Sequence, residues 1–274
     1  MLIAQLSDLH VRLPGTRAYG VVETNPFVER AFKAVMALDP TPEAIILSGD
    51  LADCGLKEEY DLLADMIRAR LTVPVYVIPG NHDHRERLKA GLAHLPGVAT
   101  DPTFVQYVVD DLPVRLVMLD SLVPEESHGD LCPARLAFLE QALAAAPDRP
   151  TLVVLHHPPI LTGIAHMDKV NLRAATAMEA VIRKHPQVER VLCGHVHRSI
   201  IARFGGSLVQ TSPSVAHQVS FDLRPDGDAT FTMEPPAYLL HDWRPDRGLT
   251  SHQLYVETYA GPYPFDSAPE PDAA

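Results

Sequence analysis

The segment VPVYVIPGNHDH, residues 73–84, decides the fold. Its first half is a short apolar run rich in β-branched residues, which predicts a buried strand. Its second half sets an asparagine, two histidines and an aspartate directly behind a glycine. This cluster raises the question of whether other strands of the chain end in the same way.

Similar apolar runs recur along the chain and alternate with helix-like stretches. Five further runs predict buried strands: LIAQL (2–6), AIIL (44–47), VRLVML (114–119), TLVVL (151–155) and VERVLC (188–193). Helices are predicted between them, at residues 25–38, 57–70 and 132–146, from their spacing and from prolines and charges placed at their ends. The repeated order of strand, helix and strand predicts an α/β fold, with a largely buried sheet and helices on both faces.

The pattern changes from about residue 200. Residues 201–212 predict a hairpin that turns at Gly205-Gly206, and residues 220–233 predict a second one that turns at Asp226-Gly227. Residues 262–274 are rich in proline and acid, which predicts a frayed tail.

Composition excludes several classes of protein. The chain has 274 residues and carries 23 basic against 35 acidic side chains, a formal charge of -12, so it should repel nucleic acid polymers. No window approaches the ~18 consecutive apolar residues of a membrane span, and MLIAQLSDLH lacks the features of a signal peptide. Three scattered cysteines argue against a disulfide framework and against a thiolate zinc site. We therefore expect a soluble, cytoplasmic protein with no membrane or nucleic acid partner.

Polar clusters follow five of the predicted strands. In open α/β sheets, ligands bind at the carboxyl ends of the strands, so loops far apart in sequence are expected to converge on one site. The candidate residues in these clusters are Asp8, His10, Asp50, Asn81, His82, Asp83, His156, His157, His195 and His197.

Carboxylate, imidazole and amide donors without thiolates suit zinc, manganese, iron or cobalt. Seven candidate ligands exceed what one ion uses, but two ions are served if one carboxylate bridges them, and paired ions promote displacement at phosphorus. Asp8 and His10 are predicted to alternate along an extended segment, which would direct both side chains to the same side, and the same holds for His195 and His197. Glycines before Asp50, Asn81 and His195 should allow tight turns and leave room for a ligand.

The ordered set of motifs DLH (8–10), GD (49–50), GNHD (80–83), His156 and GHVH (194–197) resembles the signature of the calcineurin-like metallophosphoesterases. Within that superfamily the chain is most similar to class III cyclic-nucleotide phosphodiesterases and bacterial glycerophosphodiester phosphodiesterases, through further stretches such as LSGDLADCG, PSVAHQV and YAGPY. The resemblance implies a four-layer α+β sandwich of central mixed sheets flanked by helices, with a small C-terminal β-hairpin cap.

The resemblance also implies how the chain is divided. Residues 1–200 would form the catalytic domain, 201–250 a hairpin cap and dimerisation region, and 251–274 a segment that returns to the catalytic domain and ends in an acidic tail. Because relatives use the region after the last metal motif as a dimer contact, a homodimer or larger homo-oligomer is expected.

Carried over residue by residue, the resemblance implies two divalent metal ions. A hydroxide between the ions would attack phosphorus. One ion would be held by Asp8, His10 and His197, the other by Asn81, His156 and His195, with Asp50 bridging them.

The resemblance assigns catalytic and substrate-binding roles as well. His82 would hydrogen-bond the phosphoryl or leaving oxygen, with Asp83 orienting it. His217 matches a histidine that contacts phosphate, Asn81 and His82 would also face the substrate, and Tyr19 either lines the cleft or covers the sheet edge. Three other histidines are predicted to have no catalytic or metal-binding role: His157 is predicted to hold its loop, and His84 and His166 to be solvated.

Three functions follow as hypotheses. The first is a dinuclear phosphodiesterase acting on small diesters such as glycerophosphodiesters or 3',5'-cyclic nucleotides. The alternative is a phosphomonoesterase or protein phosphatase on the same scaffold, but such enzymes commonly clamp a dianionic phosphate with arginines, and none flanks GNHDH on its ligand side. The third is a scaffold that has lost its metals, which the complete ligand set disfavours.

Overall fold

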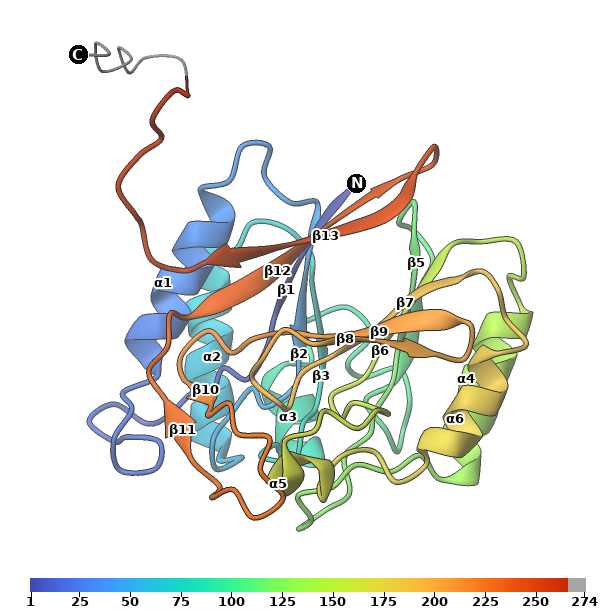
Figure 1. Ribbon diagram of the computed structural model, residues 1–274, viewed down its shortest axis with the longest axis horizontal. Coiled ribbons are helices and arrows are strands. Elements are labelled where there is room, and N and C mark those ends of the chain that lie inside the picture. The colour runs from blue at the N-terminus through green and yellow to red at the C-terminus, as the bar shows by residue number, and fades with distance from the viewer. Residues whose placement is uncertain (266–274) are drawn as a thin grey trace, which may run out of the picture.

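The computed structural model describes residues 1–265 of the chain and has two β-sheets at its centre (Figure 1). Helices α1 and α2 cover one outer side of the pair, and α4 and α6 cover the other (Figure 1). The expected fold class, mixed sheets flanked by helices, is therefore confirmed.

The first sheet has the strand order β13-β12-β1-β2-β3. Its parallel part is β1 (Leu2–Leu6), β2 (Ala44–Ser48) and β3 (Val75–Ile78). The hairpin of β12 (Ala237–Arg244) and β13 (Gly248–Tyr255) extends it, with β12 antiparallel to β1. The helices beside it are α1 (Asn25–Met36) and α2 (Lys57–Arg70), at the positions that the sequence predicts.

The second sheet has the order β4-β5-β6-β7-β9-β8. Strands β5 (Arg115–Met118), β6 (Thr151–Val154), β7 (Val188–Cys193) and β9 (Ser207–Thr211) are parallel. The edges β4 (Tyr107–Val109) and β8 (Ile201–Phe204) are antiparallel to their neighbours. Helices α4 (Pro133–Ala144) and α6 (Ala175–Ile182) accompany it; the remaining short elements are α3 (Arg85–Gly91), α5 (Ala165–Asp168), β10 (Gln218–Val219) and β11 (Phe231–Thr232).

Side-chain alternation along the strands of the second sheet divides the core. Leu116 and Met118 of β5 belong to the large apolar cluster that contains the first sheet with α1 and α2. Their neighbours Val117 and Leu119 point the other way and join the cluster around α4 and α6. Successive residues of a strand face opposite sides of its sheet, so the second sheet is buried on both faces, as its continuous apolar runs predict.

The chain beyond residue 200 contributes strands to both sheets. The hairpin predicted at 201–212 is confirmed, with Gly205 and Gly206 at φ values of 59° and 90°, and it forms an edge of the second sheet. In place of the hairpin predicted at 220–233, two residues pair on each side, in β10 and β11; β10 precedes the predicted range, and the pair lies outside the two large sheets. The longer hairpin of β12 and β13 was not predicted.

The domain boundaries at 200 and 250 remain a prediction, although the second of them falls inside β13. Most of the tail predicted at 262–274 lies outside the described residues. Within residues 1–265, no helix combines the length and the apolar character needed to cross a bilayer.

The position of Tyr238 on β12 gives a test of this architecture. Its side chain is 1% exposed and belongs to the large core cluster, so Tyr238→Ala should lower the free energy of unfolding by about 3 to 5 kcal/mol. Leu161, which is 80% exposed, is the control, and Leu161→Ala should change this free energy by no more than about 0.5 kcal/mol. Urea unfolding measures both, and equal effects would contradict the assignment of β12 to the core.

Candidate metal centre

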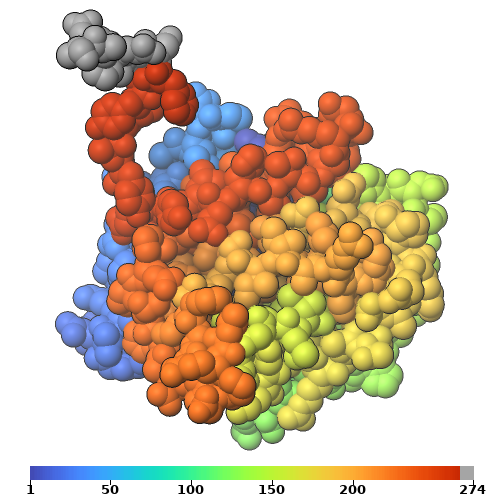
Figure 2. Space-filling view, viewed as in Figure 1, coloured from blue at the N-terminus to red at the C-terminus, as the bar shows by residue number. Residues whose placement is uncertain are grey.

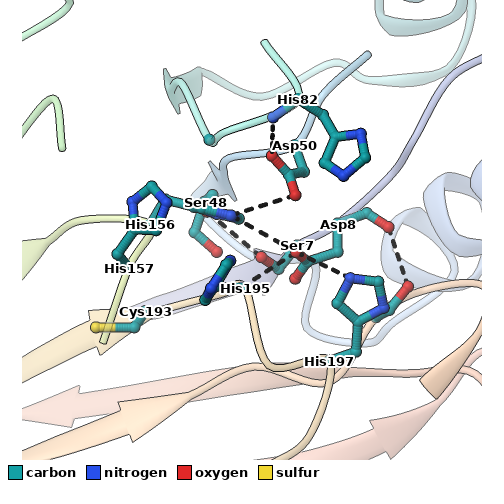
Figure 3. A network of polar contacts seen from close by, with 12 residues as sticks. Ser7, Asp8, Ser48, Asp50, His82, His156, His157, Cys193, His195 and His197 are labelled. Carbon is teal, nitrogen blue, oxygen red and sulfur yellow. Dashed lines mark hydrogen bonds and ion pairs between the residues drawn. The ribbon is translucent and has the colours of Figure 1, made fainter. Parts of the chain in front are cut away.

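The loops that follow five strands of the two sheets meet at one place. Those after β1, β2 and β3 come from the first sheet, and those after β6 and β7 come from the second (Figure 3). They bring together all seven of the residues predicted to bind metal: Asp8, His10, Asp50, Asn81, His156, His195 and His197.

Six of the seven candidate ligands fall in two adjoining groups of ligand atoms. Asp8, His10, Asp50 and His197 each offer an atom within 4.8 Å of the others, and His156 and His195 belong to a second group with His157. The Oδ2 atom of Asp50 lies 3.8 Å from Nε2 of His10 and 3.3 Å from Nε2 of His156. Asp50 therefore reaches both groups.

The protons on the histidine rings are fixed by hydrogen bonds on the side away from the site. Nδ1 of His10 donates to Oδ1 of Asp53 at 3.0 Å, and Nδ1 of His197 donates to the carbonyl oxygen of His217 at 2.9 Å. Both acceptors lack a proton to donate, so each ring, when it is neutral, presents a lone pair at Nε2. These two Nε2 atoms face each other at 3.3 Å, an arrangement that a cation between them would stabilise.

Several buried donor atoms of the site make no hydrogen bond to residues 1–265. Buried polar atoms are rarely left without a partner unless an ion or water completes them. Here the unpartnered atoms include a carboxylate oxygen, an amide oxygen and two imidazole nitrogens of the predicted set: Asp8 Oδ2, Asn81 Oδ1, His156 Nε2 and His195 Nε2. The residues present thus fit divalent metal ions of the kind that accept mixed oxygen and nitrogen donors.

Electrostatics favour the same conclusion. Burial disfavours the ionised carboxylates, but His197 holds the pKa of Asp8 below its ordinary value and His156 does the same for Asp50. In return, although burial opposes the charged ring, Asp50 raises the pKa of His156 to about 9. Two buried anions therefore depend on nearby positive charge, which divalent cations supply.

Left-handed backbone aims these side chains at the site. Asp8 and His10 have φ values of 55° and 46°, and His195 and His197 have values of 70° and 49°. The prediction explained the shared direction of each pair by alternation along an extended segment. That explanation is wrong, because the backbone at these residues is left-handed and not extended. Asp50 also has a positive φ, 49°. Each such conformation costs on the order of 1–3 kcal/mol in a residue other than glycine, and such strain is concentrated at functional sites.

Asp53 is a residue of the site that the sequence analysis missed. Its carboxylate binds His10 Nδ1 on one oxygen and Arg12 Nη1 on the other, and its carbonyl oxygen accepts from Nδ1 of His82 at 2.8 Å. Burial favours the neutral acid, but these bonds to His10 and Arg12 lower the pKa of Asp53 to about 2. Its position three residues after Asp50, in GDLAD, was the available signal.

His82 and Asp83 differ in their roles. The His82 backbone amide donates to Asp50 Oδ1 at 2.9 Å, and its ring lies beside that of His10. Asp83 was predicted to orient His82, but its carboxylate instead accepts from the amides of Leu51, Ala52 and Gly80 and from the hydroxyl of Tyr60. Asp83 therefore fastens the loops that carry Asp50 and Asn81 to each other, because its oxygens are fully used by these donors.

A cavity of about 340 Å³ opens onto the metal candidates Asp50, Asn81, His195 and His197. The rings of Tyr19, His217 and Phe231 form one wall, with centroids 5.2 to 5.4 Å apart. No lysine or arginine lines the cavity among the described residues. Tyr19 and His217 thus lie where the sequence prediction expected substrate contacts.

The three histidines that were not predicted to act in the site lie in different surroundings. His157 is buried, shares a hydrogen bond of 2.8 Å with Ser121 Oγ and packs against Gly129, in keeping with a role in holding its loop. His84 is exposed, and its ring accepts from the Arg87 amide at the start of α3. His166 was expected to be solvated, but it lines the cavity.

Comparison with known proteins identifies the class. Residues 1–199 match the calcineurin-like phosphoesterases, and the chain belongs to that family. It is 39% identical over 266 residues to the "Probable glycerophosphodiester phosphodiesterase GpdQ" of Arcobacter nitrofigilis, with 97% of each chain covered. It is 30% identical over 216 residues to the "3',5'-cyclic adenosine monophosphate phosphodiesterase CpdA" of Escherichia coli K12, covering 79% of this chain and 76% of that protein.

A solved structure shares the fold. A dimetal phosphatase from Danio rerio superposes with a TM-score of 0.64 at 15% sequence identity, over 93% of this chain and 98% of that one. At this level of identity the similarity supports the architecture alone.

Gly80 gives a test of the site's dimensions. A Cβ atom at this position would lie 2.2 Å from Asp50 Oδ1 and 2.7 Å from His156 Nε2, so Gly80→Ala should displace two candidate ligands. We expect a folded protein, by circular dichroism, whose metal content after reconstitution falls by at least half. Gly15→Ala is the control for backbone strain alone: its φ of 82° disfavours alanine, but a Cβ there has nothing within 4 Å, so the variant should keep the metal content of the parent. Equal metal content in both variants would contradict the geometry.

Proposed function

We propose that this protein is a dinuclear metal-dependent phosphodiesterase that hydrolyses small phosphodiesters, either glycerophosphodiesters or 3',5'-cyclic nucleotides. The observation that carries the proposal is a buried set of mixed oxygen and nitrogen donors that opens onto a cavity lined, among residues 1–265, by no lysine or arginine. The named activities of relatives that are similar over most of the chain support it.

In this proposal Asp50 is shared by two metal ions. Bound divalent ions would supply positive charge that activates water and stabilises the charge developing on the phosphoryl oxygens. The distances of Asp50 Oδ2 to His10 and to His156 support its shared position. Asp8, His10 and His197 would hold one ion, and Asn81, His156 and His195 the other.

His82 would handle a proton at the reacting phosphate. Its Nδ1 is engaged by the carbonyl oxygen of Asp53, which leaves Nε2 for a ligand in the cavity. Burial disfavours the charged ring, but Asp50 and the Asp53 carbonyl raise the pKa of His82 above its ordinary value. A ring protonated on both nitrogens can hydrogen-bond the phosphoryl or leaving oxygen through Nε2.

The alternative, a phosphomonoesterase or protein phosphatase, is less well supported. A monoester is largely dianionic at neutral pH and is commonly bound by guanidinium groups. The two arginines that follow the GNHDH motif are committed elsewhere. Arg85 makes two hydrogen bonds to Asp120, and Arg87 donates to the carbonyl oxygen of Gly55. The monoanionic diester therefore suits this cavity better than the dianionic monoester.

We also propose that the protein forms a homodimer or a larger homo-oligomer in the cytoplasm. The segment after residue 200 covers much of one face of the molecule (Figure 2), and it exposes large apolar side chains. Three of these side chains, Phe221, Leu223 and Tyr255, line one shared cavity, and contiguous exposed apolar surface commonly marks a partner-binding site. The most exposed between residues 201 and 255 are Ile201, Phe221, Leu223, Met233 and Tyr255. A sedimentation mass equal to the 30.1 kDa chain would refute the assembly.

The choice between diester and monoester is decided by kcat/KM. Protein stripped of metal and reconstituted with Mn²⁺ or Zn²⁺ should hydrolyse bis(p-nitrophenyl) phosphate with a higher kcat/KM than p-nitrophenyl phosphate, and the metal-free protein should hydrolyse neither. A higher value for the monoester would assign the protein to the phosphatases, and inactivity on both with metal bound would favour the scaffold.

Neighbouring variants separate metal binding from proton handling. His82→Ala should keep the metal content of the parent and lower kcat by about 10²-fold or more, because a proton donor is lost. Asn81→Ala should lower the metal content together with kcat, because its Oδ1 is one of the unpartnered donors. Metal analysis and steady-state kinetics measure both effects. Loss of metal from His82→Ala would show that His82 is a ligand.

A further inference from the structure

Gln5 is a fully buried polar residue in the middle of β1. Its side-chain Nε2 donates to Ser48 Oγ and to the carbonyl oxygen of Cys193, each at 3.0 Å. Ser48 is the last residue of β2 and Cys193 the last residue of β7. A single amide therefore ties together the ends of two strands that belong to different sheets.

Both strand ends lead directly into the metal centre, and Figure 3 shows Ser48 and Cys193 beside its candidate ligands. The carbonyl oxygen of Ser48 accepts from Nδ1 of His156 at 2.8 Å, and that bond turns Nε2 of His156 towards the site. Ser48 is followed by Gly49 and Asp50, and Cys193 by Gly194 and His195. The two residues that Gln5 contacts therefore each stand two positions before a candidate ligand, one from each group.

A second set of hydrogen bonds fixes Gln5 from the other side. Its Oε1 meets Nε2 of His241 at 3.0 Å, Nδ1 of His241 meets Ser251 Oγ at 2.7 Å, and Arg190 donates to Ser251 Oγ at 2.8 Å. Because the carbonyl oxygen of Cys193 only accepts, the amide of Gln5 has one possible orientation. His241 must then donate from Nε2 and accept at Nδ1, from the hydroxyl of Ser251.

The protonation state of His241 agrees with this pattern of hydrogen bonds. It is fully buried on β12, and burial, with a further contribution from Arg190, lowers the pKa of His241 to about 3. The ring is therefore neutral, with one proton, as the chain of donors and acceptors requires. The hydrogen bonds run from Arg190 and the β12–β13 hairpin through His241 and Gln5 to Ser48 Oγ, and the backbone carbonyl oxygen of the same serine accepts from His156.

We propose that Gln5 is a positioning residue for the metal centre, and that His241 holds Gln5 in the orientation this requires. Residues that orient metal ligands commonly change metal affinity by 10-fold to 100-fold when they are replaced. The inference rests on the proposed metal site and adds a route by which the hairpin of β12 and β13 controls it.

The test compares Gln5→Leu with a matched variant, Gln187→Leu. Gln187 also donates its side-chain amide to a buried backbone carbonyl, that of Leu143 at 3.0 Å, but it precedes β7 at the end opposite to Cys193. Mn²⁺ is titrated into the metal-stripped proteins with free Mn²⁺ followed by electron paramagnetic resonance. Thermal unfolding is measured without metal, and kcat and KM are measured for the diester.

We expect Gln5→Leu to weaken Mn²⁺ binding by about 10-fold or more and to lower kcat more than it raises KM. Gln187→Leu should bind Mn²⁺ as the parent does. The positioning role is overturned if Gln5→Leu lowers only the unfolding temperature and keeps the affinity of Gln187→Leu. A parent protein that binds no Mn²⁺ would refute the metal centre itself, and with it this role.

A second pair of variants decides the question if Gln5→Leu does not fold. His241→Gln places an amide donor near the position of Nε2 and should keep most of the Mn²⁺ affinity. His241→Phe lacks the donor and should lose affinity in the same direction as Gln5→Leu. Equal affinity in the two His241 variants would overturn the proposal.

Discussion

The close approach of two imidazole nitrogens, His10 Nε2 and His197 Nε2 at 3.3 Å, is the constraint on which the rest of the structure depends. Their protons are held on the far sides of the rings by Asp53 and by the carbonyl oxygen of His217. Lone pairs so arranged repel each other unless a proton or a metal ion lies between them. The two sheets and the left-handed backbone of the loops hold these donors together.

The net charge of the molecule also makes metal ions important for binding an anionic substrate. The chain carries a formal charge of -12, and among the described residues no lysine or arginine lines the cavity beside the site. Metal ions would therefore be the main source of positive charge available to an anionic substrate there. A cavity of about 340 Å³ with an aromatic wall is also small enough to favour a compact diester over a nucleic acid polymer.

Much of the site was predictable because each ligand motif follows an apolar run at a strand end. The seven residues were named from that pattern and from the family resemblance, and the structure brings them together. Asp53 was missed because its role depends on the ring of His10, 43 positions away in the sequence. The role of Asp83 was misjudged because adjacency to His82 in the sequence does not reveal that Leu51, Ala52 and Gly80 lie closer to its oxygens.

Local periodicity and residue chemistry were enough to predict the α/β class, the main strands and helices of the first 200 residues, and the chemical types of the donors. The pairing of β12 with β1 could not be predicted in this way, because it joins residues such as Leu2 and Asp242 from opposite ends of the chain. The left-handed turns at Asp8 and His195 likewise depend on packing: local propensity disfavours them, and the contacts of the folded protein compensate for the strain.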